Sequence, residues 1–131
     1  MSYTPSFLID NKTKYPKEPA LSVKVNGEWK TMNWSEYYSY VIEISKSLIA
    51  LNLEVGEKGA IYSYNRKEWF GCYSAMQMIN NTSVAVYHTS SSAEVEWIVG
   101  NSDSKIIFVG HNPNDNEEED KMPIVRLQSI L

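Results

Sequence analysis

The stretch GAIYSYNRKEW, residues 59–69, decides the fold class of this 131-residue chain. Its first half carries a short apolar run from Ala60 to Tyr64, which has the length of a buried strand. Asn65 and Arg66 then turn the chain. The apolar positions that follow recur at helical spacing: Trp69, Tyr73, Met76 and Ile79. A buried strand that leads into a helix is the repeating unit of parallel sheets, because parallel strands need a crossover between them.

A second predicted helix lies upstream of this stretch. Asn33 can cap its N-terminus, and Glu36, three residues later, completes a capping box. The helix ends near Asn52, before Gly56. Its apolar face follows helical spacing: Tyr37, Val41, Ile44, Leu48 and Leu51.

An antiparallel hairpin is predicted before that helix. Residues 21–25 alternate between apolar and polar side chains, and Asn26-Gly27 is a strong signal for a tight turn. Trp29 and its neighbours supply the return strand. Residues 1–18 contain two prolines and show no clear period, so we expect an irregular lead-in.

Downstream of the opening stretch, the alternation of strand and helix continues. Residues 83–87 and 106–109 are β-rich and apolar, and each predicts a buried strand. Between them Ser91 and Glu94 form another capping box, which opens a helix that ends near residues 100–101. The helix directs Val95, Ile98 and Val99 toward the core.

The predicted fold class is α/β, with an N-terminal β-hairpin followed by alternating helices and parallel strands. Three parallel strands leave open edges, which need neighbours. We therefore expect an incomplete part of a larger domain, although a homo-oligomer through the open sheet edge would also supply the neighbours. The expected organisation is an irregular lead-in over 1–18, a partial subdomain over 19–109, an acidic loop over 110–123 and the start of a further element over 124–131.

Charge and composition exclude several classes of protein. The chain carries a net charge of −4, and residues 115–121 hold five acids and one lysine, so the rest is neutral. Such a balance argues against a nucleic-acid surface. No stretch approaches the roughly 20 apolar residues of a transmembrane span, and the N-terminus lacks a signal-peptide pattern. With a single cysteine, these features predict a cytoplasmic protein and leave peripheral contact with a membrane open.

The motif search assigns no catalytic, cofactor-binding or metal residue. The six glycines form neither a dinucleotide fingerprint nor a P-loop. Cys72, His88 and His111 lack metal-ligand spacing. Cys72 lies in the middle of a predicted helix and is interpreted as a small core residue rather than a reactive thiol.

One edge of the predicted sheet gathers polar side chains. Ligands of open parallel sheets bind outside the carboxyl ends of the strands. The residues that follow two of those ends form a candidate rim: Asn65, Arg66, Tyr87, His88 and Thr89. A purely structural role for them is the alternative. Residues 89–92 precede a helix and either cap it or contact an anion.

Several motifs resemble those of long-chain fatty-acyl-CoA synthetases, which are adenylate-forming, AMP-binding enzymes. Pro19-Ala20-Leu21 and Gly27-Glu28-Trp29 are similar to the opening of the family. Asn65-Arg66-Lys67-Glu68-Trp69 resembles its Asn-Arg-x-Glu-Trp motif and is the most specific match. Tyr87-x-Thr89-Ser90-Ser91 continues in register, so that the resemblance covers about residues 19–109. Departures are Asn80-Asn81 in place of Ala-Gly, Asn52 in place of Gly and Glu57 in place of Asp.

The resemblance implies a two-step reaction in the parent enzyme. A fatty acid attacks the α-phosphate of Mg-ATP to give an acyl-adenylate, and the thiol of CoA then displaces AMP. The implied cofactors are ATP, Mg²⁺ and CoA, and the implied partner is the remainder of the synthetase domain. The family's phosphate loop, ribose-binding Asp and catalytic Lys have no counterpart here, so we expect none of these cofactors to bind this segment alone.

Three hypotheses remain. The chain is the N-terminal portion of a long-chain fatty acid–CoA ligase and is inactive by itself. Alternatively, it is a free-standing interaction or oligomerisation module with a synthetase-like fold. In the third hypothesis it is a small doubly wound domain whose 89–92 turn contacts an anion.

Overall fold

The computed structural model describes residues 4–110 and 124–126 of the chain. Helices and strands follow one another in this order: α1 (Thr4–Lys14), β1 (Pro19–Val25), β2 (Glu28–Asn33), α2 (Trp34–Ala50), β3 (Lys58–Tyr62), α3 (Lys67–Met78), β4 (Thr82–Val86), α4 (Ser92–Ser102), β5 (Ser104–Val109) and β6 (Ile124–Arg126). From α2 to β5 the elements alternate as the sequence predicts.

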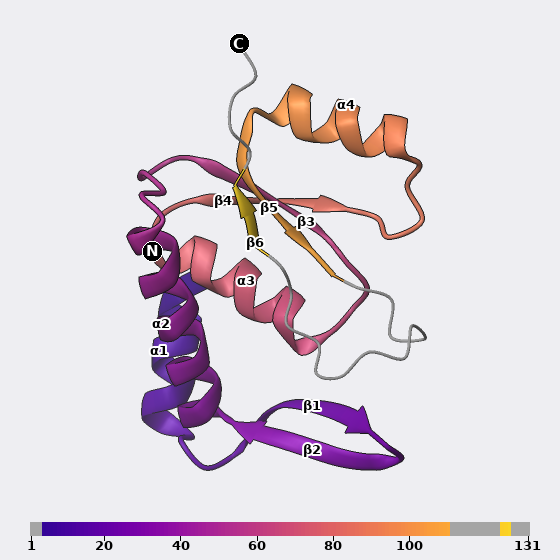
Figure 1. The fold of residues 1–131 in the computed structure, drawn as a ribbon. Helices are drawn as coiled ribbons and strands as arrows, with labels where there is room; N and C mark the ends of the chain where they lie inside the picture. The colour runs from indigo at the N-terminus through magenta and orange to yellow at the C-terminus, as the bar shows by residue number, and fades with distance from the viewer. Residues whose placement is uncertain (1–3, 111–123, 127–131) are drawn as a thin grey trace.

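The hairpin and the first cap form as predicted. Strands β1 and β2 pair antiparallel, and Asn26 and Gly27 both take positive φ, at 50° and 84°. Positive φ at both central residues is the geometry of a type I′ turn, whose twist suits a hairpin. Asn33 and Glu36 exchange both hydrogen bonds of the capping box at the start of α2. The hairpin projects away from the sheet (Figure 1).

A four-stranded sheet in the order β4-β3-β5-β6 forms the centre of the fold. β3 runs parallel to both neighbours, with Ala60 opposite Val84 on one side and Ile107 on the other. β6 adds antiparallel to β5 and covers one of the two edges that three parallel strands would leave open. The sequence predicted only the start of an element over 124–131, and 124–126 are strand.

Helices cover both faces of the sheet (Figure 1). Alternate residues of β3 explain the two cores, because successive side chains of a strand point to opposite faces. Ile61 packs with Met76, Phe108 and the residues of α1, α2 and α3 on one side. Ala60 packs with Ile107 and the residues of α4 on the other. The predicted α/β class, with parallel strands covered by helices, is therefore confirmed.

The irregular lead-in expected over residues 1–18 is wrong for Thr4–Lys14, which form α1. Pro5 lies in the first turn, where its missing N–H costs nothing, and Pro16 follows the helix end. Leu8 is 5% exposed and belongs to the core shared with α2 and α3. Pro5 and Leu8 are the buried residues described in α1, and two residues give no apolar period, so the sequence pattern could not reveal a helix that tertiary packing stabilises.

Two side-chain contacts also hold α1 against α2. The ring of Phe7 meets Trp34 edge to face at 5.9 Å between centroids. The Lys12 ammonium lies 5.1 Å from the centroid of the Tyr38 ring. Both contacts join α1 to the first turns of α2, beside the hairpin.

The three parallel strands begin earlier than predicted. β3 starts at Lys58 instead of residue 60, and β5 starts at Ser104 instead of residue 106. Their hydrogen-bond ladders include polar residues, which a search for apolar runs omits. The acidic loop predicted over 110–123 lies outside the described residues apart from Gly110.

No helix within residues 4–110 is long and apolar enough to cross a membrane.

Replacing Leu8 by Ala should lower the free energy of unfolding by about 2–4 kcal/mol, because it removes the buried anchor of α1. Ile9→Ala on the same helix is the matched control, since Ile9 is 39% exposed, and should change it by less than about 0.5 kcal/mol. Urea denaturation followed by circular dichroism measures both. If Leu8→Ala and Ile9→Ala lower the free energy of unfolding equally, Leu8 does not anchor α1 in the core.

Two neighbouring asparagines should respond in opposite directions. Asn80 has φ at 60°, so Asn80→Ala should cost about 1 kcal/mol. Asn81 is 4% exposed, and neither atom of its amide has a hydrogen-bond partner among the described residues. Asn81→Ala should therefore raise the free energy of unfolding by about 1 kcal/mol. If Asn81→Ala instead lowers the free energy of unfolding measured in urea, the Asn81 amide must be hydrogen-bonded in the folded chain.

Candidate functional site

The carboxyl ends of β3, β4 and β5 meet at one edge of the sheet because the three strands are parallel. The Gly110 N–H donates to the Tyr62 carbonyl at 2.9 Å, which joins the end of β5 to β3. A Cβ at Gly110 would overlap the Ser63 side chain. The two strand ends therefore approach closely, and only glycine fits at this point.

Two loops are tied together at this edge. The rings of Tyr64 and His88 lie 4.2 Å apart between centroids, with planes tilted by 32°. The Tyr62 hydroxyl donates to the carbonyls of His88 and Ser90, each at 3.4 Å. The loop after β3 and the loop after β4 thus hold one another, and His88 is fixed through both its ring and its backbone.

The candidate rim residues are placed in different ways. His88 contacts the loop after β3, whereas Arg66 turns to α3, where its Nε donates to Glu68 Oε2 at 2.9 Å. Both partners of this ion pair are only 12–13% exposed. Tyr87 is 81% exposed. Asn65, His88 and Thr89 are exposed as well.

Sequence reasoning missed Tyr62 and Tyr64 as members of this edge. Both lie within the apolar run that predicts a buried strand, and their hydroxyl and ring contacts depend on a loop more than twenty residues away. Aromatic residues placed at a strand end are the available signal, since tyrosine combines an apolar ring with a polar tip.

The turn over residues 89–92 caps a helix. The Ser91 N–H and hydroxyl donate to Glu94 Oε2 at 2.7 and 2.9 Å, and the Glu94 N–H donates to Ser91 Oγ at 3.4 Å. The hydrogen bond from the Ser91 backbone lowers the pKa of Glu94, and that from the side chain adds to it. A carboxylate therefore already occupies this helix N-terminus, and a bound anion would have to displace it.

Cys72 is buried at 5% exposure, as the sequence predicts. Burial, with Glu68 nearby, raises the pKa of its thiol to about 12. Burial also raises the pKa of Tyr40, again with Glu68 contributing. Neither group is an activated nucleophile, because both are held in their neutral forms.

The described residues do not by themselves fit Mg²⁺ or a nucleotide. Within residues 4–110 no three His, Cys, Asp or Glu side chains group at metal-binding distance. Glu68 pairs with Arg66, and Glu94 caps α4. The edge offers aromatic rings and backbone carbonyls, which can line a cleft but cannot neutralise phosphate charge.

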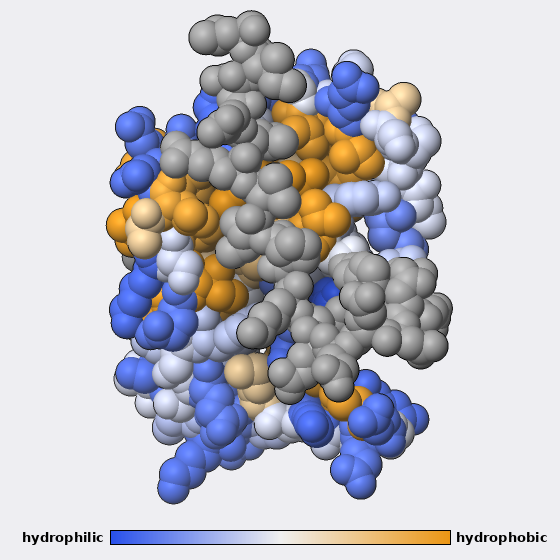
Figure 2. Space-filling view, in the orientation of Figure 1, coloured by the Kyte–Doolittle hydropathy of each residue, from blue (hydrophilic) through white to orange (hydrophobic). Residues whose placement is uncertain are grey.

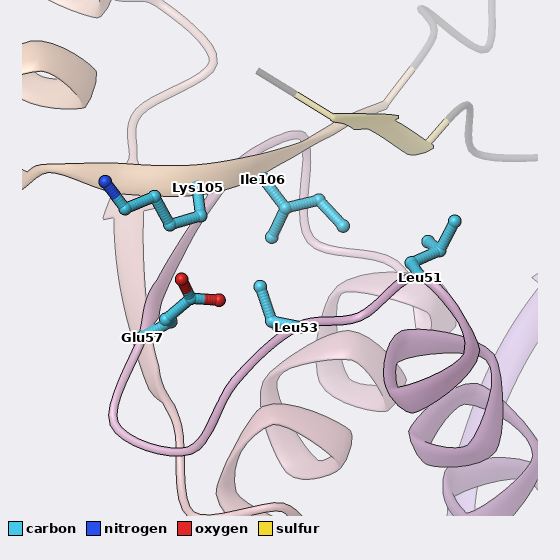
Figure 3. A pocket seen from close by; sticks show the side chains of 5 residues that line it. All are labelled: Leu51, Leu53, Glu57, Lys105 and Ile106. Carbon is cyan, nitrogen blue, oxygen red and sulfur yellow. The ribbon is translucent and has the colours of Figure 1, made fainter. Parts of the chain in front are cut away.

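A small gap lies at the opposite end of the sheet (Figure 3). It measures about 10 Å³ and is lined by Leu51, Leu53, Glu57, Lys105 and Ile106. Lys105 pairs with Asp103 at 2.8 Å. The space suffices for about one water molecule, so it is a packing gap and not a ligand site.

Comparison with known families gives one assignment for almost the whole chain. The model of the family described as AMP-binding enzyme matches residues 8–130.

Curated relatives are longer proteins. FadD15 of Mycobacterium bovis, a long-chain-fatty-acid–CoA ligase, is 26% identical over 84 residues, which are 64% of this chain and 14% of the ligase. Long chain acyl-CoA synthetase 5 of Arabidopsis thaliana is 32% identical over 117 residues, covering 84% of this chain and 16% of the synthetase. The chain thus spans about a seventh of the length of these relatives. The uncharacterized protein Rv1549 of Mycobacterium tuberculosis is 23% identical over 111 residues, covering 85% of this chain and 63% of that protein.

Solved structures share the fold. The N-terminal subdomain of Klebsiella oxytoca NpsA superposes with a TM-score of 0.76, covering 90% of this chain and 29% of that one at 14% identity. MenE of Bacillus subtilis, solved with AMP, has a TM-score of 0.73, covering 79% of this chain and 26% of that one at 19% identity. The prediction of a part of a larger adenylate-forming domain is confirmed at the level of the fold.

The thiol of Cys72 should resist alkylation in the folded chain. With a pKa raised to about 12, the thiolate is scarce at pH 8, and burial blocks access as well. A disulfide reagent should react about a thousandfold more slowly with the native chain than with the chain unfolded in guanidinium. The absorbance of the released thiol measures the rate, with Cys72→Ser as the blank. Rapid native labelling would contradict the buried, neutral thiol.

Proposed function

Because the chain belongs to the AMP-binding enzyme family, we propose that it forms the N-terminal portion of an ATP-dependent long-chain fatty acid–CoA ligase. The family match over residues 8–130 is the observation that carries the proposal. The similarity to FadD15 and to the Arabidopsis synthetase favours long-chain fatty acids as the substrate class. The parent enzyme would be cytoplasmic, with peripheral contact to membranes that hold its substrate.

The residues of this chain would position the cleft of the enzyme and would not supply its reacting groups. A carboxylate is a poor acyl donor, so the parent enzyme uses Mg-ATP to install AMP as a leaving group and CoA as the acceptor. The charge that develops on the phosphates needs cations. This chain supplies instead a rigid sheet whose edge fixes Tyr62, Tyr64 and His88, and that edge forms one rim of the cleft.

The segment alone is proposed to be inactive. Its thiol is buried and neutral, its ion pair between Arg66 and Glu68 is internal, and the helix N-terminus of α4 is capped by Glu94. The remainder of the synthetase would supply the groups that bind ATP, Mg²⁺ and CoA.

A free-standing interaction module is the second candidate. Among the described residues β4 has β3 as its only strand neighbour, which leaves one side of its backbone open to pairing. The match to the Mycobacterium tuberculosis relative, which covers 63% of that protein, supports this candidate. This reading expects a stable homo-oligomer, which sedimentation distinguishes from a monomer.

Transplantation tests the first proposal. The chain replaces the matched 117 residues of the Arabidopsis synthetase, and exchange of pyrophosphate into ATP is measured with palmitate. We expect exchange by the chimera and none by the isolated chain or by the synthetase without its segment. Exchange by the isolated chain would contradict its proposed inactivity. A chimera that folds, as judged by circular dichroism and gel filtration, but shows no exchange would contradict the assignment to this part of a ligase.

A further inference from the structure

A shallow groove on α4 gathers two exposed aromatic side chains. Its lining residues come from the loop after β4 and from one side of the helix: Tyr87, Ser90, Ala93, Glu94, Trp97 and Ile98. We call this surface the α4 groove. Tyr87 is 81% exposed and Trp97 is 68% exposed. Large rings exposed together at one place are a feature of surfaces that bind another protein segment.

The outer side of α4 leaves room for a neighbouring helix. Ala93, Trp97 and Gly100 are spaced by four and three residues, which places them on one face. A Cβ at Gly100 would meet no atom within 4 Å. A large ring between two small residues provides an anchor and permits a partner helix to approach the backbone closely.

One helix does not cover this face of the sheet. Four strands spaced about 4.8 Å apart span about 14 Å, whereas a helix with its side chains is about 10 Å wide. Tyr62, Val84 and Val109 lie on the α4 side and are only partly buried. Hydrophobic side chains gather in the upper half of the molecule, around the sheet and α4, while the hairpin end is mostly hydrophilic (Figure 2). A second helix beside α4 would complete the layer.

Charge defines the chemistry of the partner. Residues 82–102 contain no lysine or arginine, and Glu94 and Glu96 are both exposed on α4. Lys105, the next basic residue along the chain, is held by Asp103 at 2.8 Å. This surface repels nucleic acids, acidic lipids and free phosphates. It favours a partner that joins apolar side chains with a basic rim.

We propose that the α4 groove is the docking surface for a basic amphipathic helix, supplied by the part of the synthetase that lies outside this chain. The inference rests on the proposed function, because the chain spans only 14–16% of its ligase relatives and the rest must pack somewhere. Tyr87 directly precedes His88, whose ring lies on Tyr64. Docking at the groove would therefore hold the rim loop in place and couple assembly of the domain to the shape of its cleft.

A peptide experiment on the chain as it exists tests the chemistry. The probe is a synthetic helix of leucine and lysine, about 18 residues long, so that it is long enough to form. We expect saturable binding, measured by calorimetry, that weakens at least tenfold on Trp97→Gln. Trp29→Gln is the matched control, because Trp29 is 70% exposed on the hairpin and should leave the affinity unchanged.

Three outcomes would overturn the docking chemistry. If a leucine–glutamate helix binds as tightly as the leucine–lysine helix, charge does not select the partner. If Trp97→Gln and Trp29→Gln weaken binding equally, the helix does not bind at the α4 groove. A dimer of the chain alone that dissociates on Trp97→Gln, seen by light scattering, would assign the groove to a second copy.

The chimera tests the source of the helix. In the isolated chain Trp97→Gln and Trp29→Gln should both leave the melting temperature unchanged, because both rings are exposed. In the chimera Trp97→Gln alone should lower it by about 3 °C or more, because the ring becomes buried. If Trp97→Gln leaves the melting temperature of an active chimera unchanged, this inference is overturned and the proposed function stands. An inactive but folded chimera overturns the proposed function, so the two failures are distinct.

Discussion

Parallel pairing of β3 with strands on both sides is the constraint on which the rest of the structure depends. Ala60 lies opposite Val84 and Ile107, and this register aligns the ends of three strands. Because each parallel connection needs a crossover, the helices must lie on the faces of the sheet. Alternation along β3 then sends Ile61 to the core of α1, α2 and α3, and Ala60 to the core of α4.

The same register creates the candidate site. Loops that follow parallel strands emerge at one edge, so residues distant in sequence become neighbours. Tyr62 and Tyr64 contact the loop that carries His88, and Gly110 closes the third strand end against Ser63. What results is an edge lined by aromatic rings, beside which Arg66 is already paired with Glu68. In the proposed ligase this edge would shape the cleft, and the groups that neutralise phosphate charge would come from the rest of the enzyme.

The two faces of the sheet differ in how completely they are covered. Three helices pack against one face, and the core there includes Leu48, Met76 and Phe108, each buried completely. Among the described residues one helix, α4, packs on the other face and leaves part of it uncovered. Trp97 on α4 and Tyr87 in the loop before it are exposed there, and residues 82–102 contain no lysine or arginine. This asymmetry agrees with a segment that spans a small share of its ligase relatives.

Local signals in the sequence determined the hairpin, both capping boxes, the alternation of helix and strand and the burial of Cys72, because each depends on a few adjacent residues or on a period. The family motif around Asn65 to Trp69 likewise pointed to the AMP-binding family. Only the tertiary structure decided the helix of Thr4–Lys14, since its stability comes from Leu8 in a shared core. It alone also decided the pairing of Tyr64 with His88, the capture of Arg66 by Glu68 and the exposure of Trp97. Those features depend on contacts between segments far apart in the chain, and no local pattern encodes the distance between them.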